Sequence, residues 1–392
     1  MARGERREHR STVDFSRSSD PSSPGPGREH GITDGAGRSR HRRRKRHRSG
    51  SRVPRSYAWA DRASGWLLLF LTVFTPWAFG TTQGWAVGTA TAASCCVGVL
   101  LLAKHLLRRN LDYRPPVWGE HVVVSESSGQ LQQGAGQPDL AGRILAALTV
   151  LFLGYVAVSA WNARADYNEV TRQFEYFEAP WRWLPHSYDR GATWYAFWQY
   201  AGLACVFWGL RDWLRHRSPA DEREDDTPRW ADPQAPLVIP SRLRLLLWIL
   251  CANGAVLALV SILQRADGTN RLLWLLESRS SKPANFVFGP WAYRGNAAQY
   301  FNLLWPVCLA FWLWMQERAT RALTGRLGRF DGPQLVLLPC AAFMAACPMI
   351  SGSRGGALVS VALGATAALL ILLVSRREMG SMVRWLTAGG MA

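Results

Sequence analysis

Two arginines in glycine-rich segments are the side chains of this sequence best suited to chemistry. Arg294 lies in the segment FGPWAYRGN (residues 288–296), and Arg354 lies in SGSRGG (residues 351–356). A guanidinium group is charged at any cellular pH, and its planar fork of N–H donors matches phosphate oxygens. Because each arginine adjoins the same side of an apolar block, we interpret the two as a candidate pyrophosphate clamp.

The neighbours of these arginines extend the candidate substrate-binding site. Asn296 and Ser353 supply polar side chains, and Gly355 would let an anion approach backbone N–H groups at the start of a helix, where the helix dipole favours negative charge. The alternative is that each arginine only anchors a helix end at the interface or forms an ion pair there.

His186 is the candidate general base. It is the single histidine in the segments assigned below to the external side, and Asp189, three residues later, could orient it. The alternative is a loop histidine without a catalytic role. Aromatic side chains crowd the same segment, where they could stack on sugars or belong to the aromatic belt of a membrane interface.

The elements that must position these residues are apolar blocks without charged residues. Each block has about 16 to 20 residues, the length with which a helix crosses roughly 30 Å of hydrocarbon. The sequence therefore predicts an all-α polytopic transmembrane bundle of eight spans. A truncated ninth span is expected from about Met382, so the natural protein is expected to be longer. The eight blocks are residues 65–80, 85–103, 144–161, 192–210, 245–263, 297–315, 335–350 and 355–374.

The distribution of basic residues predicts the orientation. With the N-terminus in the cytoplasm, 36 of the 46 lysines and arginines lie inside and 10 outside, as the positive-inside rule requires. Residues 1–62 are predicted to be a disordered basic cytoplasmic tail, and residues 63–392 the membrane domain. The tail is interpreted as a determinant of topology that also contacts membrane lipids. Specific nucleic-acid binding is the less favoured alternative.

Two classes of function are disfavoured by what the blocks contain. None of the eight blocks has Asp, Glu, Lys, Arg or His in its interior, whereas an ion-coupled transporter usually holds its coupling ion with such a residue. The seven cysteines all lie within the blocks without CxxC spacing, so we interpret them as packing residues and expect no metal site.

Two segments resemble motifs of the O-antigen ligase and O-antigen polymerase family, and the resemblance covers about residues 245–375. Residues 285–306 resemble the family's arginine-containing segment that precedes an apolar span. Residues 351–357 (SGSRGGA) resemble its S-x-S-R-G-A segment. In the first segment Gly295 separates the arginine from Asn296, and Ala297 stands where the family often has histidine.

This resemblance implies a bacterial inner-membrane enzyme of the glycosyltransferase C class. The implied donor is a glycan linked to undecaprenyl pyrophosphate, held by Arg294 and Arg354, without a metal or other cofactor. The implied acceptor is a hydroxyl of lipid A core, of another glycan or of a protein, so ligase and polymerase both remain open. In the family the base is a histidine in a later external loop. The alternative is a non-catalytic membrane protein such as a lipid-linked glycan exporter or a scaffold.

Overall fold

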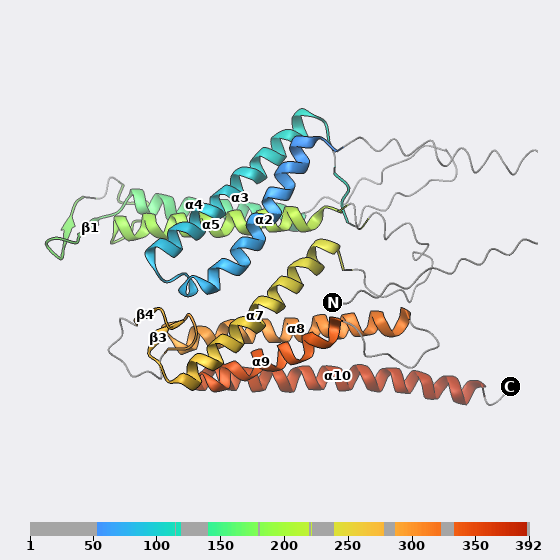
Figure 1. Cartoon of the computed structure of the whole chain (residues 1–392). Coiled ribbons are helices and arrows are strands. Elements are labelled where there is room, and N and C mark those ends of the chain that lie inside the picture. The colour runs from blue at the N-terminus through green and yellow to red at the C-terminus, as the bar shows by residue number, and fades with distance from the viewer. Residues whose placement is uncertain are drawn as a thin grey trace, which may run out of the picture. The chain divides into compact units, whose positions relative to one another are not determined.

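The computed structural model describes residues 53–113, 115–118, 140–178, 181–218, 221, 239–277, 287–322 and 333–389. These residues are mostly helical, and one helix lies on each of the eight predicted blocks (Figure 1). Most of the predicted basic tail, residues 1–52, lies outside the described residues. The helices are α2 (Arg55–Trp77), α3 (Gly84–Asn110), α4 (Leu140–Trp161), α5 (Arg190–Arg215), α7 (Ser241–Asp267), α8 (Arg294–Ala322), α9 (Leu337–Ile350) and α10 (Arg354–Gly389), with 3-10 turns at Phe79–Thr81 and Pro333–Val336.

Four of the described helices are long and apolar enough to cross a membrane: α3, α4, α7 and residues 354–373 of α10. On α4 the side chains of Val150 and Leu151 are 69% and 68% exposed, as expected for a surface in contact with lipid rather than water. These helices mark the chain as a helical membrane protein. Helix α9 is shorter, with 14 residues.

Two helix boundaries differ from the sequence-based prediction. Helix α2 begins at Arg55, inside the stretch assigned to the tail, and its first two turns bury Tyr57 and Asp61. The prediction of a separate ninth span from Met382 is wrong, because residues 382–389 continue α10 without a break. No proline lies between residues 375 and 381, so every N–H there remains available to the helix.

The helices pack in two groups along the chain. In the first group α5 contacts both α3 and α4, and α2 contacts α3; in the second, α9 contacts α7, α8 and α10. The second group coincides with the region of family resemblance. Helix α7 also contacts α2 and α5, and Trp77 Nε1 donates a 2.7 Å hydrogen bond to Asn253 Oδ1 of α7.

Each group has its own core of large apolar side chains and small residues. Leu68, Val97 and Trp213 form the centre of the first, and Phe301 and Met344 lie at the centre of the second. Small residues allow neighbouring helices to pack at a short distance. A Cβ atom on Gly209 of α5 would lie 2.3 Å from Val97 Cγ1 of α3, so only glycine allows this spacing.

Two short antiparallel hairpins follow α4 and α7. Strands β1 (Ala165–Asn168) and β2 (Gln173–Tyr176) pair with Ala165 opposite Tyr176. Strands β3 (Arg271–Leu272) and β4 (Leu276–Glu277) pair with Leu272 opposite Leu276.

Asp221 caps α7 and ties its start to the segment that follows α5. Its carboxylate accepts hydrogen bonds from the backbone N–H groups of Ser241 at 2.7 Å and of Ser218 at 2.9 Å. Burial raises the pKa of Asp221, but these hydrogen bonds outweigh burial and hold the pKa below its ordinary value. The ionised carboxylate therefore stabilises the N-terminus of α7.

Candidate functional site

The ends of α7, α8, α9 and α10 position the predicted arginines. Arg265 lies in the last turn of α7, which Gly268 caps in the left-handed conformation (φ +69°). The carboxylates nearest in sequence have other partners: Asp267 Oδ2 accepts from Trp274 Nε1 at 2.9 Å, and Glu277 Oε1 accepts from Arg271 Nη2 at 2.9 Å.

A buried turn before α8 sets the position of Arg294. The backbones of Phe288 and Trp291 exchange hydrogen bonds of 3.1 and 3.2 Å, and both side chains are almost fully buried. Gly289, between them, has φ +59°, and a Cβ on it would lie 2.1 Å from Ser261 Oγ of α7. The turn thus packs against α7 as only glycine permits, and α8 begins at Arg294 three residues after it.

The turn between α9 and α10 is held by its own serines. Ser351 is buried, and its hydroxyl donates to Pro348 O at 2.8 Å and accepts from Ser353 N at 3.3 Å. Ser353 Oγ accepts from Gly356 N at 3.3 Å and so caps α10. We call residues 351–354 the Gly352 turn. The Ser353 hydroxyl, predicted to bind substrate, thus serves the helix cap.

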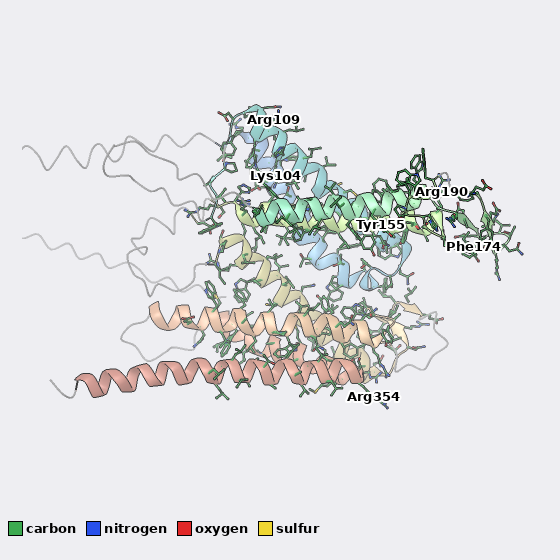
Figure 2. All side chains as sticks on the ribbon, turned by 180° about the vertical axis from the view of Figure 1, so that it is seen from behind. Lys104, Arg109, Tyr155, Phe174, Arg190 and Arg354 are labelled. Atoms are coloured by element: carbon green, nitrogen blue, oxygen red, sulfur yellow. The ribbon has the colours of Figure 1, made fainter. Side chains whose placement is uncertain are left out.

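Two arginines from different helices lie beside the Gly352 turn. The position of a Cβ atom on Gly352 would be 3.5 Å from Arg294 Nη1 and 3.9 Å from Arg265 Nη2. Both arginines are half-buried, whereas Arg354 is exposed at the start of α10, on the same turn (Figure 2). We call Arg265, Arg294 and Arg354 the arginine group. The structure thus adds Arg265, which the sequence analysis did not single out.

Two of the three charges in the arginine group have no acidic partner among the described residues. Arg265 and Arg354 form no ion pair with any residue that the structure describes. The guanidinium groups of Arg265 and Arg294 lie beside one turn and can donate to several oxygens of one anion, and pyrophosphate carries enough oxygens to engage both.

The glycines of the α10 N-terminus have different environments. Gly355 is exposed, and a Cβ there would meet nothing within 4 Å, so its backbone is open to a ligand. A Cβ on Gly356 would lie 2.3 Å from Ala298 Cβ of α8, which makes Gly356 a packing residue. Asn302 Nδ2 donates to Gly356 O at 2.9 Å and joins the same two helices. Asn296 is exposed in the first turn of α8.

His186 lies in the other group of helices. It is exposed on the loop between β2 and α5. Arg190, the first residue of α5, is labelled in Figure 2. Asp189 was predicted to orient His186, but Asp189 Oδ1 accepts from Ala192 N at 2.9 Å and caps α5. No hydrogen bond between described residues joins His186 to Asp189, and the structure does not bring His186 to the arginine group.

A buried network of charged residues was not expected from the sequence. Lys104 is fully buried, and its Nζ lies 2.7 Å from Asp212 Oδ2 and 3.4 Å from Asp61 Oδ1. Arg108 Nη1 lies 2.8 Å from Asp212 Oδ1, and Arg242 pairs with Asp61. We call these five residues the buried ion network. It joins the starts of α2 and α7 to the ends of α3 and α5, so α2 and α7 run in the direction opposite to α3 and α5.

The network extends to His216, which follows α5. His216 Nδ1 lies 3.7 Å from Asp212 Oδ1. Burial lowers the pKa of His216 below its ordinary value, although Asp212 acts in the opposite direction. His216 is therefore mainly neutral near pH 7. The signal that could have revealed the network is the placement of one charged residue just beyond each of four apolar blocks.

Comparisons with protein families, curated proteins and solved structures found no match to this chain.

Proposed function

We propose that this protein transfers a glycan from an undecaprenyl-pyrophosphate donor to an acceptor hydroxyl on the external face of the membrane. The observation that carries the proposal is the convergence of Arg265 and Arg294 on the Gly352 turn, which also holds Arg354. The motif resemblance of residues 285–306 and 351–357 to the O-antigen ligase and polymerase family supports the same site and donor.

The arginine group would act on the leaving group. Breaking the bond between the sugar and the pyrophosphate leaves negative charge on the phosphate oxygens, and fixed guanidinium groups stabilise that charge as it grows. The proton of the acceptor hydroxyl must pass to a base. His186 lies in the first helix group, so we assign the donor site to the arginine group and leave the base unassigned.

The proposal places all eight helices across the membrane in a glycosyltransferase C-like arrangement. Alternating directions would put the buried ion network at one surface and the arginine group at the other. The 36 to 10 division of basic residues supports a cytoplasmic location for the network and an external location for the arginines.

Transfer by the full chain in proteoliposomes tests this proposal. The assay supplies a polyprenyl-pyrophosphate glycan and candidate acceptors, and it measures glycan leaving the donor. We expect Arg294→Lys and Arg354→Lys each to reduce transfer on the order of 10²-fold, because lysine keeps the charge but loses the fork. Deleting residues 2–40 should leave transfer nearly unchanged, which separates the arginine group from general positive charge.

The outcomes separate two classes of function. Transfer that depends on Arg294 and Arg354 supports the enzyme. Binding of the donor without transfer by the parental chain would favour a non-catalytic exporter or scaffold. Transfer at the parental rate by both properly inserted lysine variants would refute the role of the arginines.

A further inference from the structure

One face of α5 changes from apolar to basic along its length. Tyr200, Ala204, Trp208, Arg211 and Arg215 follow one another at intervals of three or four residues, which places them on one side of a helix. Two cavities lie along this face, one beside its basic end and one beside its apolar part.

The first cavity, which we call the basic pocket, has a volume of about 220 Å³. It lies between α3, α5 and Val117, whose segment forms an antiparallel bridge with His216. Arg108, Arg211 and Arg215 line the basic pocket together with His216. Leu101 and Trp208 form its apolar side.

The charges that line the basic pocket favour an anion. Of the described lining residues Asp212 alone is acidic, and its two oxygens lie 2.7 Å from Lys104 Nζ and 2.8 Å from Arg108 Nη1. Arg108 Nε is buried and donates no hydrogen bond to a described residue. Among the described lining residues, three arginines stand against one aspartate, and this excess of positive charge favours an anion.

The second cavity, which we call the apolar groove, has a volume of about 300 Å³ and lies between α4 and α5. Phe152, Leu153, Leu203 and Phe207 line it, and Trp208 lines both cavities. The Arg211 guanidinium carbon lies 5.2 Å from the Trp208 ring centre, so the change from apolar to basic surface occurs at one pair of side chains.

We propose that these cavities bind one anionic phospholipid, with its phosphate in the basic pocket and an acyl chain in the apolar groove. Arginine forks match phosphate oxygens, and basic pockets between membrane helices suit anionic headgroups. A free phosphate compound would use the pocket but would gain nothing from the groove. This site is separate from the arginine group and does not depend on the proposed transfer.

Native mass spectrometry of the purified full chain tests the lipid site. The protein receives equal amounts of phosphatidylglycerol and phosphatidylcholine with the same acyl chains, and the retained lipids are counted. We expect preferential retention of one phosphatidylglycerol per chain. Arg215→Gln should reduce that preference on the order of fivefold, and adding Arg211→Gln should reduce it further. Arg109→Gln is the matched control. Arg109 is exposed at the end of α3 that carries Arg108, and it does not line the basic pocket (Figure 2).

Soluble glycerol 3-phosphate distinguishes a lipid from a free phosphate compound. We expect glycerol 3-phosphate to bind on the order of 100-fold more weakly than phosphatidylglycerol, because it has no acyl chain to bury. We expect Phe207→Ser to weaken retention of the lipid while the variant still elutes as a single species. Equal retention of the two lipids would overturn the proposal. So would an equal effect of Arg109→Gln and Arg215→Gln, or an affinity for glycerol 3-phosphate that matches that of the lipid.

Discussion

Gly352 lies so close to Arg294 that a Cβ atom on the glycine would be 3.5 Å from Nη1 of the arginine. Gly352 also has φ +72°, a conformation that costs other residues about 1–2 kcal/mol. We therefore predict that Gly352→Ala lowers the free energy of unfolding by about that amount. Gly355→Ala is the control, because its Cβ would meet nothing within 4 Å. Thermal unfolding in detergent should separate the two variants, and equal melting temperatures would contradict the turn geometry.

The contact between Gly356 and Ala298 sets the spacing of α10 and α8. A Cβ on Gly356 would lie 2.3 Å from Ala298 Cβ, so Gly356→Ala must push the helices apart and strain the hydrogen bond from Asn302 to Gly356 O. We expect a loss of about 1–3 kcal/mol, as for other overpacked sites. The double variant Gly356→Ala/Ala298→Gly removes the 2.3 Å contact and should recover most of the loss. A double variant less stable than Gly356→Ala would show that this contact does not set the spacing.

Lys104 holds together two carboxylates in the buried ion network. Replacing it with methionine leaves Asp61 and Asp212 with fewer positive partners in a buried site, which costs about 3–5 kcal/mol when one partner of a buried pair is removed. We predict a strong loss of folded protein for Lys104→Met, measured as the monodisperse fraction after extraction. Arg109→Met, at an exposed position of the same helix, should behave as the parent.

A second substitution tests the electrostatic origin of that loss. Lys104→Met/Asp212→Asn removes one of the two negative charges as well, so it should recover part of the folded fraction. If Lys104→Met alone leaves the folded fraction unchanged, the network does not stabilise the helix ends.

The eight helices could be predicted because uncharged apolar blocks of sufficient length are visible in the sequence. Their ends could not. A block ends at the first charged residue, whereas α2, α3 and α5 extend through Asp61, Lys104 and Asp212, and Lys104 pairs with both aspartates. That pairing joins residues far apart in the sequence and leaves no local pattern.

Only part of the candidate site could be predicted, because contacts between residues far apart in the sequence leave no local pattern here either. Arg294 and Arg354 stand out by their glycine-rich neighbours, but only the fold brings Arg265 beside the Gly352 turn, where Arg294 also lies. Ser353 was assigned to substrate because its role as helix cap depends on where α10 begins. Applying the argument for Arg294 to every arginine at the predicted external end of a block would have found Arg265.

The hydrogen bonds that Asp221 accepts at the start of α7 should make the stability of the protein depend on pH. Because the folded-state pKa of Asp221 is lowered, its contribution is present above the unfolded value of about 3.9 and is lost as the pH falls through the folded value. We therefore expect the parent to melt at a higher temperature than Asp221→Asn at pH 7, and the difference to shrink below about pH 4. A difference that stays constant from pH 7 to pH 3 would show that the carboxylate charge does not stabilise α7.

Binding of a short-chain polyprenyl pyrophosphate to the purified full chain tests most directly whether the arginine group holds the pyrophosphate of the donor. Affinity is measured in detergent for the parent, Arg265→Lys, Arg294→Lys and Arg354→Lys, with polyprenyl monophosphate as the ligand control. We predict that each variant binds the pyrophosphate about 10-fold or more weakly, since charge-assisted hydrogen bonds contribute about 1.5–3 kcal/mol. The monophosphate should bind the parent more weakly than the pyrophosphate. Pyrophosphate affinities equal to that of the parent in all three folded lysine variants would contradict the assignment of this site.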